Sequence, residues 1–215
     1  SAQSQRPRYS KNPFETQETL KNIKDYKTLI RYDSTTLDSF ILATMNTYHI
    51  PGVQACIVQD DEIIWKGAYG YANIENNRLV TDSTLFVIQS VSKTVTGTAL
   101  MQLWEEGLFG LDDDINNYLP FSVRNPSHPN DLITFRMLLT HTSSINDNWN
   151  VINSLTTWGG DSPIALDSFL VNYLVSGGSY YYSYNYYAWA PGSHWEYCNV
   201  GAALIGYLVE TISNN

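Results

Sequence analysis

The chain has 215 residues, of which 43% are hydrophobic and 13% aromatic, while only 15% are charged. This composition excludes disorder for most of the chain, because disordered segments combine high charge with few aromatic residues. The formal net charge is −9, and seven of the twelve basic residues lie in residues 1–31, so that the remainder carries −13. A body this acidic repels phosphate backbones, which excludes nucleic-acid binding as the main function. No apolar run reaches the roughly 18 residues that a membrane-spanning helix needs.

The chain opens with a segment that differs from the rest in charge and periodicity. Residues 1–31 form a polar, basic N-terminal arm, which we expect to be a solvated leader. Apolar side chains at helical spacing then predict a helix over residues 37–45, which ends in the turn at residues 49–52. The regular part of the fold therefore begins after the arm.

Two strand-like runs come next, at residues 53–59 and 62–71. They are joined at residues 60–61, which predicts a β-hairpin. Gly67 and Gly70 in the second run indicate either a bulge or the close approach of another backbone. Two strands do not make a stable sheet alone, so we expect further strands to complete it.

The second half of the chain is mainly helical by its periodicity. Predicted helices follow Ser90 as far as Gly107 and span residues 135–140, 164–174 and 202–212. Gly107 suits the end of the first of these helices, and Thr134 suits the N-cap of the second. The rest of residues 143–195 is rich in Ser, Asn, Gly and Tyr.

The cysteines and histidines do not form a recognisable framework. Cys56 and Cys198 are too few for a disulfide scaffold or a zinc site, and the four histidines lack metal-ligand spacing. We therefore expect neither a metal nor another cofactor. The few lysines and many Tyr, Asn and Ser residues suit an exported protein, so we expect a secreted or periplasmic protein from which a leader has been removed.

The strongest local motif is Ser90-Val91-Ser92-Lys93 at the start of a predicted helix. Three residues is nearly one helical turn, so the Lys93 amine lies on the same face as the Ser90 hydroxyl. A serine hydroxyl needs a base to become a nucleophile, and a lysine at a positive helix N-terminus can serve. The alternative is an ordinary helix start with a surface lysine.

A second motif, Tyr197-Cys198-Asn199, precedes the last predicted helix. A tyrosine with a lysine nearby can carry a proton between nucleophile and leaving group, and Asn199 can bind a substrate carbonyl. Tyr71-Ala72-Asn73 has the same pattern, and two Ser-x-Asn sequences compete with it. The position before a helix favours Tyr197.

Three blocks together resemble one known family. "FVIQSVSKTVTGTALMQLWEEGLFGLDDDINNYLP", "ITFRMLLTHTSSI" and "APGSHWEYCNVGAALIGYLVE" occur in the order found in the serine β-lactamase-like and penicillin-binding-protein superfamily. The match lies in the branch of class C β-lactamases, family VIII esterases and D-amino-acid peptidases. With "HIPGVQACIVQDDEIIWKGAYGYAN", it covers roughly residues 36–212. The motif set of this superfamily begins with Ser-x-x-Lys, and this branch has Tyr-x-Asn as the second element.

The resemblance implies a fold and an activity. It implies an α+β fold of the β-lactamase/transpeptidase type, with an antiparallel sheet flanked by helices and an all-helical lobe. Residues 32–108 would be the N-terminal part of the α/β domain with the nucleophile helix, and residues 109–215 the mainly helical lobe. The expected function is a serine hydrolase that acts through an acyl-enzyme on esters, D-amino-acid peptides or amides, or β-lactams. The alternative is a non-catalytic binding or scaffold protein that retains the fold.

The resemblance also assigns roles to residues. Ser90 would be the acylated nucleophile, Lys93 its proton partner, Tyr197 the general base and acid, and Asn199 a substrate-binding residue. His141 is expected to be a structural residue that ties a loop. Seven of the ten residues from Tyr180 to Trp189 are aromatic, and we expect Tyr180, Tyr182 and Trp189 to contact substrate; a loop that packs its own rings is the alternative.

Three departures from the family pattern stand out. Gln89 occupies a position where the family often has glycine or alanine, and Ser144 one where it has glycine. The third motif, Lys-Thr-Gly or His-x-Gly on an inner strand, does not follow Tyr197. We expect that motif, together with the C-terminal strands missing from this chain, in a C-terminal segment or second chain that completes the sheet.

Overall fold

The structure is a computed structural model that describes residues 34–157 and 159–214. The predicted N-terminal arm, residues 1–31, lies outside the described residues. The chain divides into two compact units, the first ending at Val87 and the second beginning at Ile88. Each unit is described by itself below.

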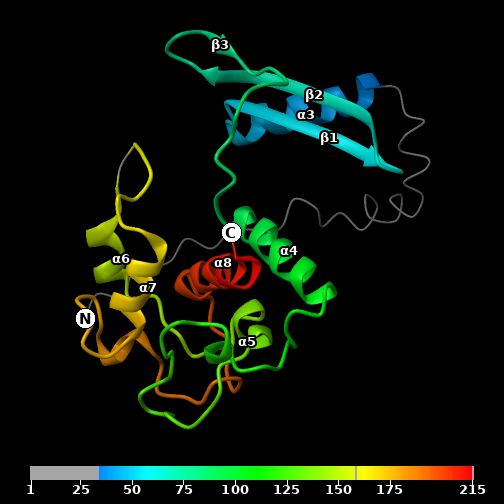
Figure 1. The fold of residues 1–215 in the computed structure, drawn as a ribbon. Helices are drawn as coiled ribbons and strands as arrows, with labels where there is room; N and C mark the ends of the chain where they lie inside the picture. Colours follow the sequence, from blue (N-terminus) through cyan, green and yellow to red (C-terminus); the bar gives the residue numbers. More distant parts are fainter. Residues whose placement is uncertain (1–33, 158, 215) are drawn as a thin grey trace. The chain divides into compact units, whose positions relative to one another are not determined.

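The first unit contains one helix and a small sheet (Figure 1). Helix α3 (Ser34–Tyr48) is followed by β1 (Gly52–Gln59), β2 (Glu62–Asn73) and β3 (Arg78–Leu79), which form an antiparallel sheet in the order β1-β2-β3. The predicted helix and hairpin are confirmed. Strand β3 was not predicted, because two residues carry no alternating pattern.

The turn of the hairpin follows from two residues in the left-handed region. Asp60 and Asp61 have φ of 51° and 64°, and this pair of positive values gives the turn that matches the twist of the flanking strands. The pairing of β1 with β2 has one irregularity, between Ile57 and Val58. Gly70 has φ of 71°, and a Cβ atom there would collide with the Pro51 carbonyl oxygen, so the predicted close approach of two backbones occurs at Gly70.

Helix α3 is attached to the sheet by both apolar and polar contacts. The Met45 side chain is buried and reaches the backbone at Gly70. The Tyr69 hydroxyl on β2 donates a hydrogen bond of 2.5 Å to Asp38 on α3. Burial and this carboxylate raise the pKa of Tyr69 to about 12, so the phenol stays protonated and keeps donating at neutral pH.

The second unit is helical. Its α-helices are α4 (Ser92–Glu105), α5 (Phe135–Leu139), α6 (Trp149–Leu155), α7 (Leu166–Leu174) and α8 (Asn199–Ser213), and its 3-10 turns are η1 (Gln89–Val91), η2 (Ile115–Asn117) and η3 (Ser183–Asn185). Four of the helices were predicted, and the Thr134 side chain caps α5 as expected by accepting from the Met137 N–H. Helix α6 was not predicted, since its seven residues bury only Val151.

Helix α8 is the centre of the second unit (Figure 1). Helices α4, α5 and α7 pack against it, and Leu204 and Leu208 on α8 are fully buried. Phe109 and Phe135 stack at 4.0 Å between ring centroids in the same core. Helix α4 therefore belongs with the helical unit by its contacts. The reason is that the apolar face of α4 packs on α8.

A buried asparagine joins distant loops of this unit. The Asn125 side-chain amide donates to Ser144 Oγ at 2.9 Å and to the carbonyl oxygens of Tyr187 and Trp189 at 2.8 and 3.1 Å. These bonds hold the aromatic segment that precedes α8 against the loop that follows α5. They thereby fix the two loops that approach the start of α8.

The architecture confirms the expected α+β class. The described residues form a three-stranded antiparallel sheet and six α-helices. None of the described helices is both long and apolar enough to cross a membrane.

Candidate active site

Ser90 and Lys93 lie where η1 leads into α4. Ser90 is the middle residue of η1, and Lys93 is the second residue of α4. The two side chains lie on one face, as their spacing predicts. The Lys93 Nζ donates a hydrogen bond to Ser90 Oγ at 3.2 Å. The local motif thus places an amine in contact with the candidate nucleophile.

Tyr197 and Asn199 reach the same place from the other end of the unit. Both lie at the turn into α8, for which Cys198 is the N-cap. The Tyr197 hydroxyl donates to Ser90 Oγ at 2.8 Å, and Lys93 Nζ donates to Asn199 Oδ1 at 2.7 Å. Because α4 packs on α8, residues more than a hundred positions apart in the sequence form one hydrogen-bonded cluster.

The charge of Lys93 acts on the Tyr197 phenol. Lys93 Nζ lies 5.0 Å from the centroid of the Tyr197 ring. The pKa of Tyr197 is lowered, chiefly by Lys93 and then by the contact with Ser90, against the smaller opposing effects of burial and Asp147. A lower pKa increases the fraction of Tyr197 that is present as the phenolate at a given pH. A phenolate can accept the proton of Ser90.

His141 supports the turn that carries Tyr197. Its Nδ1 accepts the Cys198 backbone N–H at 3.2 Å, and its ring lies 4.6 Å from the Tyr197 ring. Burial and the charge of Lys93 lower the pKa of His141, while Asp147 opposes them. A neutral ring leaves Nδ1 free to accept, so His141 has the contacts of a loop-tying residue, as the sequence suggested.

Sequence reasoning missed Asp147. This carboxylate is buried and accepts the backbone N–H groups of Asn199 and Val200 together with the Asn199 side-chain amide. One signal was available, since no other Asp, Glu, Lys or Arg occurs between Arg136 and Asp161. A charge that is buried must be paired or hydrogen-bonded, so an isolated carboxylate of this kind is a candidate for a structural role.

Two of the three departures from the family pattern, Gln89 and Ser144, share a backbone conformation. Gln89 has φ of 48° and Ser144 has φ of 61°, values that favour glycine. Ser144 has a compensating contact, since its hydroxyl accepts from Asn125. The positions at which the family has small residues are thus positions of left-handed backbone, and Gln89 holds that conformation next to the nucleophile.

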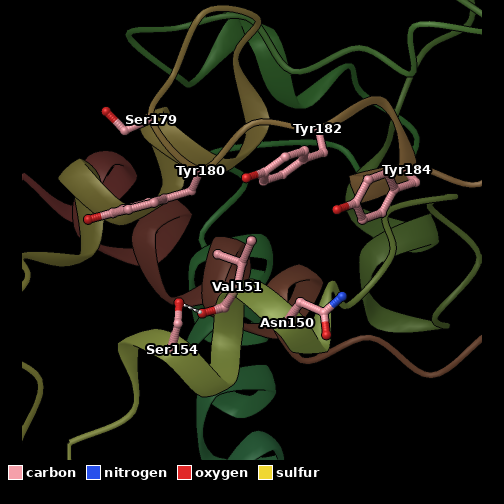
Figure 2. A pocket seen from close by; sticks show the side chains of 7 residues that line it. All are labelled: Asn150, Val151, Ser154, Ser179, Tyr180, Tyr182 and Tyr184. Atoms are coloured by element: carbon pink, nitrogen blue, oxygen red, sulfur yellow. Dashed lines mark hydrogen bonds between the residues drawn. The ribbon is translucent and has the colours of Figure 1, made fainter.

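The predicted substrate contacts lie in a different group of residues. Tyr180 and Tyr182 line a pocket of about 160 Å³ beside α6 (Figure 2). The full lining is Asn150, Val151, Ser154, Ser179, Tyr180, Tyr182 and Tyr184. Trp189 stacks on Tyr187 at 4.1 Å between ring centroids. None of these residues is in the Ser90 cluster, so their role in substrate binding stays a prediction.

The alternative motifs have other surroundings. Tyr71-Ala72-Asn73 lies on β2, in the first unit, where Tyr71 pairs with Leu79. Ser144 is engaged by Asn125, and Ser183 belongs to η3. Among residues 34–157 and 159–214, no group of His, Cys, Asp or Glu side chains is arranged to hold a metal ion.

Comparison with known proteins places the chain. The profile of the family described as Beta-lactamase matches residues 37–215. "Protein flp" of Staphylococcus aureus (strain MRSA252) is 27% identical over 177 residues, which are 82% of this chain and 33% of that protein. The chain therefore spans about a third of the length of the curated relatives that it matches.

Two solved structures have the same fold, and each is somewhat more than a quarter identical in sequence to this chain. The octameric penicillin-binding protein homologue from Pyrococcus abyssi is 27% identical, with a TM-score of 0.64 over 85% of this chain and 40% of that one. The D-alanine carboxypeptidase AmpC from Burkholderia cenocepacia is 28% identical, with a TM-score of 0.54 over 81% of this chain and 42% of that one. The expected resemblance is confirmed, and the chain belongs to the Beta-lactamase family, within the superfamily that also includes penicillin-binding proteins.

Proposed function

We propose that this protein is a serine hydrolase that acts through an acyl-enzyme on Ser90. The observation that carries the proposal is the contact of Ser90 Oγ with both Lys93 Nζ at 3.2 Å and the Tyr197 hydroxyl at 2.8 Å. An activated serine needs a base within hydrogen-bond distance, and that base is in turn oriented by a third group. Membership of a family of serine hydrolases supports the same conclusion.

In the acylation step, Tyr197 as the phenolate takes the proton of Ser90. The Oγ atom bonds to the substrate carbonyl carbon, and the carbonyl electrons move to oxygen. When the tetrahedral intermediate collapses, the bond to the leaving group breaks and that group takes the proton from Tyr197. Lys93 favours the phenolate by its positive charge, in line with the lowered pKa of Tyr197.

In the second step, water replaces the leaving group. Tyr197 takes a proton from the water, whose oxygen bonds to the acyl carbon, and the proton then returns to Ser90 as the acid departs. Asn199 is the proposed substrate contact. Its Oδ1 is engaged by Lys93 and one Nδ2 hydrogen by Asp147, so the other Nδ2 hydrogen is the one that can bind a substrate carbonyl.

The proposed substrates are esters, D-amino-acid peptides or amides, and β-lactams, which share an acyl group open to attack. The 28% identical D-alanine carboxypeptidase supports a D-amino-acid substrate. Tyr180, Tyr182 and Trp189 remain the proposed contacts for the groups beside the scissile bond. Their rings offer flat apolar faces, and the two tyrosines also offer hydroxyl groups, which suit an acyl or leaving group with both kinds of surface.

We further propose that a C-terminal segment or a second chain completes the sheet and supplies the third motif. Apolar side chains on the small sheet support this, since Val58 and Ile63 are 59% and 64% exposed. A small sheet gains stability from more strands and from elements packed on its face, and such packing would cover these side chains. The relatives, about three times as long as the matched region, give room for these strands.

The test is covalent labelling of the complete gene product with a fluorophosphonate probe and a fluorescent penicillin. We expect labelling of the wild type, none of Ser90→Ala, and unchanged labelling of Ser92→Ala, which alters a neighbouring serine. The absence of label with both probes at high concentration would instead favour a non-catalytic protein that retains the fold.

A further inference from the structure

The Asp147 carboxylate lies in the loop before α6. Its hydrogen-bond partners at the start of α8 lie 51 to 53 positions later in the sequence. Its two oxygens accept the Asn199 backbone N–H at 2.9 and 2.8 Å and the Val200 N–H at 3.0 Å. The Cys198 thiol donates to it at 3.4 Å. Asp147 is thus a cap for α8 supplied from another part of the chain.

Asp147 also sets the direction of the Asn199 side chain. A carboxylate accepts hydrogen bonds and cannot donate them, so the Asn199 amide must turn its Nδ2 towards Asp147, at 2.7 Å. The Oδ1 atom then faces the other way, where Lys93 Nζ donates to it at 2.7 Å. If the Asn199 amide were reversed, its NH2 group would face the Lys93 ammonium. The hydrogen bond between Lys93 and Asn199 would then be lost.

We propose that Asp147 is a positioning residue, which holds Lys93 against Ser90 through the oriented amide of Asn199. The proposal rests on the proposed function, because it concerns the same Ser90 chemistry. The relay has three links in order: Asp147 to Asn199, Asn199 to Lys93, and Lys93 to Ser90 at 3.2 Å. Asp147 itself is buried, which shields the carboxylate from competing water, and its bond to Asn199 is part-buried.

The direct test is Asp147→Asn in the complete gene product. The new amide presents a donor where Asn199 also presents donors, so the Asn199 amide either loses a partner or reverses. The matched control is Asp113→Asn in the same unit. Asp113 accepts from the Gly110 N–H at 2.8 Å and the Tyr118 hydroxyl at 2.7 Å, so the control loses similar bonds.

The readouts separate positioning from folding. Stopped-flow labelling with a fluorophosphonate gives the acylation rate constant and the dissociation constant of the reversible complex. For D147N, we expect acylation to slow about 10- to 100-fold, the effect of losing a charge-assisted hydrogen bond, with reversible binding within about threefold. D113N should keep the wild-type rate after any loss of stability is matched by temperature.

A double-mutant cycle tests the path through Asn199. If Asp147 acts through that amide, D147N combined with N199A should be no slower than N199A alone, within about twofold. If the double variant were slower than N199A by the full factor that D147N alone produces in the acylation rate, the relay would be contradicted. Acetylation of lysines, followed by mass spectrometry, gives a readout without catalysis: D147N should raise the rate at Lys93 relative to Lys66.

Each outcome supports or overturns the proposal. A wild type that does not label on Ser90 contradicts the proposed function, and unaltered Lys93 acetylation in D147N then overturns the relay as well. A labelled wild type with a D147N rate equal to that of D113N overturns the relay alone. Asp147→Ser, which keeps a short acceptor, is used if D147N does not fold; if both are unfolded at 25 °C, Asp147 serves folding and the proposal fails.

Discussion

Replacing Tyr197 by Phe deletes one oxygen atom at the centre of the candidate site. That hydroxyl donates to Ser90 Oγ at 2.8 Å, whereas the ring itself contacts the His141 ring at 4.6 Å between centroids. The ring contact and the overlying Lys93, 5.0 Å from the ring centroid, are kept in the variant. The substitution therefore removes the proposed proton carrier with little change in packing.

The expected magnitude follows from the role of the lost group. General acid–base catalysis contributes about 100- to 10,000-fold to a rate, so acylation of Ser90 should slow by that factor, or by about 2.7 to 5.4 kcal/mol in activation free energy. Tyr197 is 38% exposed, and a single hydrogen bond contributes about 1 kcal/mol, so the free energy of unfolding should change by about 1 kcal/mol or less.

The assay is the rate of covalent labelling by a fluorophosphonate, with the urea unfolding curve measured in parallel. Tyr71→Phe is the matched control, because Tyr71 belongs to the other Tyr-x-Asn sequence and is 43% exposed. Y71F should label at the wild-type rate. A Y197F rate within threefold of the wild type would refute the assignment of Tyr197 as the base.

Three further predictions concern the candidate site and the loop that follows α5. Lys93→Met removes the charge that lowers the pKa of Tyr197. In a pH–rate profile, the rise of the residual acylation rate should therefore move to more alkaline pH. A profile at the wild-type position would contradict the coupling of Lys93 to Tyr197. The pKa of His141 is lowered in the folded state, so protonation of this histidine favours unfolding. The free energy of unfolding is therefore unaffected by His141 above the ordinary histidine pKa and decreases as the pH falls below that pKa. His141→Asn can still accept the Cys198 N–H, and its urea midpoint should fall less between pH 7 and 5 than that of the wild type; an equal fall refutes the assignment. Ser144→Gly and Ser144→Ala both lose the hydroxyl, but only glycine relieves φ of 61°, so the glycine variant should be more stable by about 1 kcal/mol in urea unfolding, and equal stabilities would argue against backbone strain.

The sequence predicts those parts of the fold whose information is local. The hairpin shows this, because two apolar runs and the pair Asp60-Asp61 suffice to specify it. Strand β3 and helix α6 were missed because two and seven residues with few buried side chains carry little periodicity. The packing of α4 on α8 could not be derived from local patterns either, since it joins segments far apart in the sequence.

The candidate site divides in the same way. The contact of Ser90 with Lys93 follows from helical spacing alone, whereas the approach of Tyr197 was expected from the family resemblance and its position before a helix. Neither helical spacing nor the family resemblance indicated Asp147, because its main partners are backbone N–H groups at the start of α8, which have no residue signature. Its isolation as a charged residue was the one signal that the sequence offered. The pocket lined by Tyr180 likewise depends on how α6 lies beside the aromatic segment (Figure 2).

The central claim is that Ser90 is a nucleophile activated by Lys93 and Tyr197. The most direct measurement is the intact mass of the complete gene product after reaction with a fluorophosphonate, followed by tandem mass spectrometry of its peptides. We expect one adduct per chain, on Ser90 and not on Ser92. An adduct on another residue, or no adduct under conditions that label a known serine hydrolase, would contradict this claim.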